Sequence, residues 1–148
     1  METEVRLRVA VLGLFVADDR VLLLHQMTDP EPNCWDLPGG GLEPEETLME
    51  GLAREIREET GITDFQVERL LTIAENFFPE GEGKVLHSLN IIYQCRVEPK
   101  PTNLSSDDPE VGPLGIQWLA IATLTPQMCS NRVWAALQAA GLVSTINN

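Results

Sequence analysis

The first part of the chain alternates between apolar runs and short polar breaks, a pattern typical of strands joined by tight turns. Residues Val5 to Phe15 and Val21 to Gln26 are dominated by aliphatic side chains. Ala17 to Arg20, which carries two aspartates, has the composition of a turn. We therefore predict a β-hairpin, followed by a loop over Thr28 to Asn33, where two prolines interrupt the pattern.

A helical pattern takes over between Pro44 and Gly61. Thr47 to Thr60 is a run of residues that favour helices. Pro44 suits the first helical position, where a missing N–H costs nothing, and Gly61 suits the left-handed residue that ends a helix. We predict a helix of about four turns that begins near Pro44. Its apolar side chains share one arc, which we expect to pack on the core: Leu48, Met49, Leu52, Ala53 and Ile56.

The second half of the chain predicts two more strands, a long loop and a final helix. Phe65 to Ile73 and Val85 to Val97 are strand candidates, whereas Glu98 to Leu114 contains four prolines and is expected to be a loop. Ser130 can cap a last helix that runs to Ala140. The length and the absence of repeats predict a single domain over residues 1–148.

Three glutamates on the predicted central helix define the candidate chemistry. Glu55, Glu58 and Glu59 lie within one arc, because spacings of three and four residues put side chains on adjoining turns of one face. Their repulsion favours a neutralising partner, and a hard dication fits three convergent carboxylates better than Arg54 and Arg57 do. Mg²⁺ is the expected ion, with Mn²⁺ as the alternative. The competing interpretation is an acidic helix face that is simply solvated.

These glutamates belong to a longer pattern of fixed positions. Gly40 is followed by five residues, Glu46, seven residues, and then the run from Arg54 to Ile62. The pattern resembles the signature box of the Nudix hydrolases at every position. Trp35 to Gly40 looks like the strand and turn that lead into that box, and Gly115 to Leu119 is similar to the family's late strand. The resemblance implies an α/β fold with a mixed sheet, an α/β/α sandwich in which the box forms a loop, a helix and a second loop.

The resemblance also implies roles for residues of the box. Glu58 and Glu59 are the expected metal ligands, together with the carbonyl of Gly40. Glu55 is expected to be a further ligand or the base that activates water, and Arg54 to hold Glu55 by a bidentate pair. The implied reaction is metal-dependent hydrolysis of a pyrophosphate linkage in a nucleoside triphosphate, a nucleoside diphosphate sugar or a related molecule, giving a nucleoside monophosphate or an equivalent product.

A further carboxylate is expected from a loop outside the box, because members of this family often use one. We predict Glu110, which a turn can orient just before the late strand. Asp107 and Asp108, in a Ser-rich stretch that we expect to be mobile, are its rivals. Glu75 and Glu80 are the remaining candidates.

Contacts to the rest of the substrate are expected from the second strand and from an aromatic pair. Many relatives carry an arginine at the end of the second strand to contact phosphate, whereas this chain has His25 and Gln26 there. We predict that these two side chains and Phe78 bind the substrate, Phe78 by stacking on a base. Phe77 offers the same chemistry, and the alternative is that both rings belong to the core.

The overall composition agrees with a small enzyme and argues against several partners. The 148 residues carry a net charge of −13, which is unfavourable for binding duplex nucleic acid or an acidic membrane surface. No apolar run approaches the length of a membrane span, and no signal peptide is recognisable, so a cytoplasmic location is expected. The three cysteines lack metal-binding spacing and are expected to be reduced and buried: Cys34, Cys95 and Cys129.

Two other classes of function stay open at the level of the sequence. A Nudix-type fold can serve as a sensor that binds a nucleotide or metabolite without hydrolysing it, although such domains usually lose carboxylates of the box and this box is intact. A structural acidic protein could use the helix as an interaction surface. In the favoured interpretation the partner is a small nucleotide-type substrate, and the protein is a monomer or a homodimer.

Overall fold

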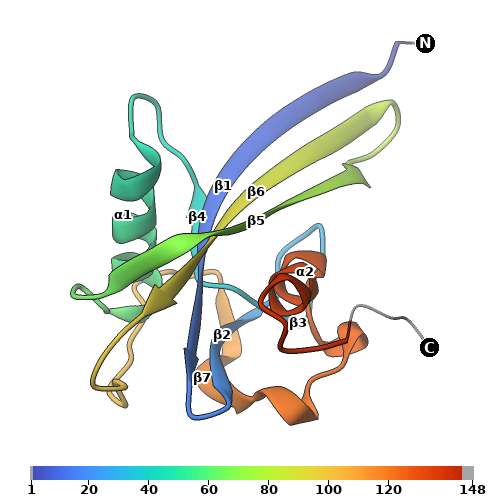
Figure 1. Ribbon diagram of the computed structural model, residues 1–148. Coiled ribbons are helices and arrows are strands. Elements are labelled where there is room, and N and C mark those ends of the chain that lie inside the picture. The colour runs from blue at the N-terminus through green and yellow to red at the C-terminus, as the bar shows by residue number, and fades with distance from the viewer. Residues whose placement is uncertain (1, 145–148) are drawn as a thin grey trace.

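The computed structural model describes residues 2–144 and places a mixed sheet between two helices, as the resemblance implied (Figure 1). The long strands are β1 (Glu4–Ala17), β5 (Gln66–Pro79), β6 (Lys84–Arg96) and β7 (Val111–Ala120). The short strands are β2 (Arg20–Gln26), β3 (Cys34–Asp36) and β4 (Gly39–Gly41). The helices are α1 (Leu48–Thr60) and α2 (Asn131–Ala139), with two 3-10 turns, η1 (Ile121–Thr123) and η2 (Pro126–Met128), before α2.

Strand β1 lies at the centre of the sheet. It pairs in parallel with β6 over most of its length, and β5 continues the sheet antiparallel to β6. Along its other edge β1 pairs with β4 and, at its end, with β2 across the turn at Asp18 and Asp19. Strand β2 pairs in turn with β3 and β7. The predicted hairpin of the first two strands is therefore confirmed, and β4 brings the start of the box beside β1.

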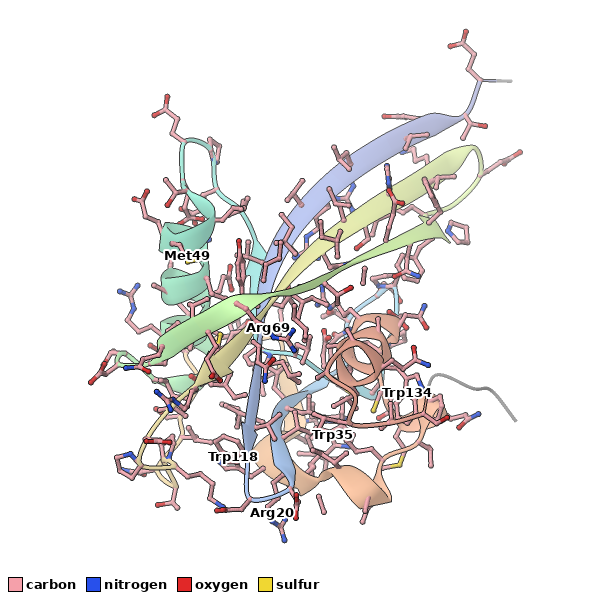
Figure 2. All side chains as sticks on the ribbon, viewed as in Figure 1. Arg20, Trp35, Met49, Arg69, Trp118 and Trp134 are labelled. Carbon is pink, nitrogen blue, oxygen red and sulfur yellow. The ribbon has the colours of Figure 1, made fainter. Side chains whose placement is uncertain are left out.

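The two faces of the sheet pack against different helices, because alternate residues of a strand point to opposite sides. The cluster under α2 includes Leu12, Leu14, Leu23, Val133 and Leu137, and the cluster under α1 includes Val11, Phe15, Leu22, Leu52 and Ile56. Figure 2 shows Trp35 and Trp134 on the side of α2. On α1 the expected packing of Leu52 and Ile56 is confirmed, but that of Met49 and Ala53 was wrong, because both lie on the exposed side of the helix. Helix α1 is thus anchored by one flank, which leaves its acidic flank to face the edge of the sheet near β4.

Helix α1 begins at Leu48, later than the sequence pattern suggested. Pro44 and Glu45 instead form a tight turn, with a positive φ of 65° at Glu45. The hydroxyl of Thr47 accepts a hydrogen bond from the amide of Glu50, and the carboxylate of Glu50 accepts one from the amide of Thr47. The predicted start near Pro44 was wrong, because this reciprocal capping box determines the first residue of the helix more strongly than the preference of proline for that position does.

The loop after β6 ends earlier than predicted. Strand β7 begins at Val111, which pairs with Gln26 of β2. The expectation of a loop as far as Leu114 was wrong, because the ladder tolerates an irregularity in which Gly115 takes a positive φ of 68°. Glycine and proline in this segment therefore mark a bulge within β7. The loop that faces α1 is confined to the residues before Val111.

The final helix and the cysteines agree with the sequence. Ser130 is the N-cap of α2, and its hydroxyl accepts from the amide of Val133. The three cysteines are free and buried, and burial raises the pKa of their thiols, to about 12 for Cys34 and Cys95. None of the helices within residues 2–144 has the length and apolar character needed to cross a membrane.

Candidate functional site

A cleft of about 480 Å³ opens where the box meets the sheet. Its walls come from the second half of α1, from strands β5 and β6, and from the loops over residues 28–31 and 107–111. The three glycines of β4, Gly39–Gly41, complete the walls and are called the glycine turn below. Nine carboxylate side chains line it, against two guanidinium groups, those of Arg8 and Arg132. Such an excess of negative charge around one hollow is unfavourable, so the cleft is suited to a ligand that brings positive charge.

The end of α1 and the glycine turn of β4 are in close contact. Gly61 ends the helix with a left-handed φ of 81°, as predicted. The amide of Gly39 donates to the carboxylate of Glu59 at 2.5 Å. A Cβ atom on Gly40 would lie 2.6 Å from the carboxylate of Glu55, so a side chain there would displace that carboxylate. The glycine at position 40 therefore lets the Glu55 carboxylate lie against the backbone of β4.

Glu55 and Glu59 are the buried members of the acidic cluster. Glu59 is 6% exposed, and the side chain of Glu55 is 14% exposed against 43% for Glu58. Burial raises the pKa of Glu55, and burial with a smaller contribution from Asp108 raises the pKa of Glu59 to about 9, although the Gly39 amide acts in the opposite direction. Burial therefore disfavours the ionised form of both carboxyl groups, which a nearby cation would favour.

Arg54 is the centre of the ion pairs behind this cluster. It forms a bidentate pair with Glu46, at 2.7 Å and 2.8 Å, and donates a single hydrogen bond to Glu55 at 2.9 Å. It also donates to the carbonyl of Gly41 at 3.1 Å. The expected bidentate pair between Arg54 and Glu55 was wrong, because Glu46 takes both arms of the guanidinium, which lowers the pKa of Glu46 to about 2. Arg54 does not line the cleft, so it positions Glu55 and the glycine turn from behind.

The loop before β7 docks on the end of α1. The amide of Asp107 donates to the carbonyl of Glu58 at 2.8 Å, and the amide of Ser105 donates to the carbonyl of Thr60 at 3.2 Å. These bonds satisfy carbonyl groups that the end of a helix leaves free. The stretch that was expected to be mobile is therefore anchored, and it brings Asp107 and Asp108 to the cleft.

Asp108 is the loop carboxylate in contact with the buried cluster. It shares a hydrogen bond with Glu59, and its Oδ1 atom accepts the amide of Glu110 at 2.9 Å. Glu110 also lines the cleft, so its role as the extra carboxylate stays a prediction, but the contact with Glu59 favours Asp108. Glu75 and Glu80 lie outside the cleft lining, each paired with a basic side chain.

The two adjacent phenylalanines of β5 point to opposite sides of the sheet. Phe78 lines the cleft. Phe77 is 62% exposed and stacks on His87 with 4.3 Å between the ring centroids. Only Phe78 is therefore placed to contact a ligand in the cleft, and neither ring belongs to the buried core.

The predicted substrate contacts of β2 lie at or behind the wall of the cleft. Gln26 lines it, but its amide donates to the carbonyls of Thr28 and Glu31 at 2.8 Å and 2.9 Å. His25 is 4% exposed and lies outside the lining. Its ring nitrogens are engaged by the Asn33 side chain at 3.1 Å and the Leu114 amide at 3.3 Å. These contacts give both residues an evident structural role in holding the neighbouring loops.

A largely buried ion pair in the wall of the cleft could not be predicted from the sequence. Arg132 of α2 donates to both carboxylate oxygens of Asp36, at 2.9 Å and 2.6 Å, and to the side chain of Asn90 at 2.9 Å. Burial opposes the ionisation of Asp36, but the charge of Arg132 and the hydrogen bonds from Arg132, Ser130 and the Leu37 amide together outweigh it and hold the pKa of Asp36 below its usual value. The only sequence signal was the place of Asp36 just before the box, since its partner lies 96 positions later.

The donors around Glu55 and Glu59 fit a divalent cation by their chemistry. Within residues 2–144 no three Asp, Glu, His or Cys side chains are already arranged to hold a metal ion. The groups around Glu55 and Glu59 that could bind a metal are nevertheless carboxylate and backbone oxygens, the ligands that Mg²⁺ and Mn²⁺ prefer. Burial raises the pKa of Glu55 and of Glu59, and a cation bound beside them would favour the ionised form of both. Gly40 lies against Glu55, where its backbone can join the carboxylates.

Comparison with known protein families agrees with this arrangement, because the NUDIX domain model matches residues 5–137. The chain belongs to the Nudix family. An ADP-ribose pyrophosphatase of Methanocaldococcus jannaschii is 36% identical over 84 residues, which are 57% of this chain and 49% of that protein. The match thus spans about half the length of that relative.

Two further comparisons cover more of this Nudix chain. A MutT-like protein of Streptomyces ambofaciens is 32% identical over 125 residues, which are 84% of this chain and 68% of that protein. A solved structure, a MutT Nudix hydrolase from Burkholderia pseudomallei, matches with a TM-score of 0.70 and 26% identity, covering 94% of this chain and 99% of that one. The likeness therefore includes both the box and the sheet around it.

Proposed function

We propose that this Nudix protein hydrolyses a pyrophosphate linkage in a nucleoside diphosphate derivative, with Mg²⁺ or Mn²⁺, and releases a nucleoside monophosphate or an equivalent phosphate product. The observation that carries the proposal is the burial of Glu55 and Glu59 against the glycine turn, in the wall of a cleft of about 480 Å³. A cleft lined by carboxylates can accept a polyanion only when cations are bound there.

In this proposal the cation is held by oxygens of the box and of the loop before β7. Glu55, Glu58, Glu59 and the carbonyl of Gly40 are the donors from the box. When bound, the cation neutralises charge on the phosphate oxygens and lowers the pKa of a water molecule. Asp108 is the favoured extra carboxylate, because it already contacts Glu59. Glu110 is the alternative, since it lines the same cleft.

In this proposal Glu55 takes the proton from the attacking water. Arg54 donates to its Oε1 atom, and the carboxylate lies against Gly40. Burial raises the pKa of Glu55, which brings a carboxylate closer to the proton affinity that a base needs at neutral pH. Phe78, which also lines the cleft, is available to stack on the base of the substrate.

A small panel of substrates tests the proposal. The protein is incubated with ADP-ribose, a nucleoside triphosphate and a nucleoside diphosphate sugar, each with Mg²⁺ and with EDTA, and the products are separated by chromatography. We expect a monophosphate product from at least one compound, with Mg²⁺ only. Turnover that is equal in EDTA would contradict the metal site. Binding of a panel member without turnover would instead identify the protein as a sensor.

A further inference from the structure

Arg8 is a cationic side chain of the cleft that no residue of the box accounts for. It lies on β1, on the same face as Ala10 and Leu12, because alternate residues share a face. The register places Ala10 opposite Gly41 of β4. A Cβ atom on Gly41 would lie 3.4 Å from the Nε atom of Arg8, so the guanidinium packs beside the glycine turn. It is half-buried and lines the cleft.

The guanidinium of Arg8 is unpaired, unlike its neighbours. Among residues 2–144 it makes no hydrogen bond and no ion pair. Arg132, the other guanidinium of the cleft, is neutralised by Asp36, and Arg6, two residues earlier on the same face of β1, pairs with Glu80 at 2.5 Å. Burial, with smaller contributions from Arg132 and Arg6, lowers the pKa of Arg8, although the charges of Glu55 and Asp36 act in the opposite direction. A half-buried charge without a partner is unfavourable in the free protein.

We propose that Arg8 binds a non-bridging phosphate oxygen of the diphosphate group of the substrate. The phosphate identity of this ligand rests on the proposed function. The carboxylates of the cleft can reach a phosphate only through a cation, whereas a guanidinium can donate to it directly. Arg54 and Arg132 are already engaged by carboxylates, and Arg8 has its donors free. Its position beside Gly41 places this contact next to the start of the box.

Binding of a non-hydrolysable diphosphate tests the assignment without turnover. The probe is α,β-methylene-ADP with Mg²⁺, measured by calorimetry, with adenosine as the ligand that lacks phosphate. We expect Arg8→Gln to weaken binding of the probe about 10- to 100-fold, as for loss of a charge-assisted hydrogen bond, and to leave adenosine unchanged. Arg8→Lys should recover part of the affinity, because it restores the charge but not the planar fork. Arg6→Gln, which removes an exposed arginine outside the cleft, should bind like the wild type.

A melting experiment separates a binding role from a structural one. Because Arg8 has no partner in the free protein, Arg8→Gln should melt at or above the wild-type temperature. Equal affinity of Arg8→Gln and wild type for the probe, no measurable affinity of the wild type, or a lower melting temperature of Arg8→Gln would each overturn the assignment. If the wild type binds the probe through Arg8 but hydrolyses no member of the substrate panel, the proposed reaction fails and the phosphate contact stands.

Discussion

Replacing Glu59 with glutamine should make the metal-free protein more stable, although it removes a proposed metal ligand. In the folded protein the pKa of Glu59 is about 9, against an ordinary value of 4.5. The folded state therefore keeps a proton that the unfolded chain releases above pH 4.5, so the stability of the wild type falls as pH rises from about 4.5 to about 9. Glutamine stays neutral over this range, and its side-chain oxygen can still accept the amide of Gly39.

The size of this change in stability depends on the range of pH over which Glu59 is protonated in the folded protein and ionised in the unfolded chain. At pH 7 this interval is about 2.5 pH units, and at about 1.36 kcal/mol for each unit the carboxylate destabilises the folded state by ~3 kcal/mol. Glu59 is 6% exposed, so solvent screens little of this effect. For a domain of this size 1 kcal/mol shifts the melting temperature by roughly 2–4 °C. Glu59→Gln should therefore melt roughly 6–12 °C above the wild type in EDTA at pH 7, with a smaller difference at pH 5.

Thermal melts in EDTA from pH 5 to pH 9 measure this difference. The matched control is Glu58→Gln, on the same helix with a side chain that is 43% exposed, which should follow the wild type at every pH. Saturating Mg²⁺ should raise the melting temperature of the wild type more than that of Glu59→Gln, because the ion gains a charged ligand only in the wild type. A Glu59→Gln variant that melts below the wild type at pH 8 in EDTA would refute the reasoning.

Three further predictions concern the metal and its surroundings. Saturating Mg²⁺ should raise the wild-type melting temperature by mass action, and an unchanged value would count against a metal site. Asp108→Asn should lower kcat more than Glu110→Gln does, and the reverse order in steady-state kinetics would restore Glu110 as the extra carboxylate. Gly40→Ala should lower kcat at least tenfold while circular dichroism stays unchanged, because its Cβ atom would displace the Glu55 carboxylate; wild-type kcat in this variant would show that the contact is not needed.

The parts of the site that lie close together in the sequence could be predicted from it. The spacing of Glu55, Glu58 and Glu59 fixes their common arc, since helical geometry is local, and Gly61 ends the helix as expected. The start of the helix is also determined by nearby residues, because the capping pair of Thr47 and Glu50 outweighs the preference of proline for the first helical position. The sequence therefore contains the signal for a start at Leu48, although the prediction placed the start near Pro44.

The contacts between distant segments could not be predicted in the same way. Asp36 and Arg132 are brought together by the packing of β3 and α2, and neither residue has a neighbour in the sequence that reveals the other. Asp108 reaches the acidic cluster because the loop satisfies free carbonyl groups at the end of α1. His25 lies at the end of a strand, but a hydrogen bond to the side-chain oxygen of Asn33 and one from the Leu114 amide hold it behind the cleft wall.

Burial disfavours the ionised form of carboxyl groups and of a guanidinium in the same cleft, and this restricts what can bind there. A cation would favour the ionised form of Glu55 and Glu59 and an anion that of Arg8, since Arg8 forms no ion pair with either carboxylate. A metal ion alone would bind the glutamates but leave Arg8 without an anionic partner. A free phosphate could pair with Arg8, but the carboxylates of the cleft would repel it. A diphosphate that carries its own divalent cation satisfies both sides at once. The electrostatics of the cleft therefore favour a metal–diphosphate complex over either component alone, in agreement with the proposed reaction.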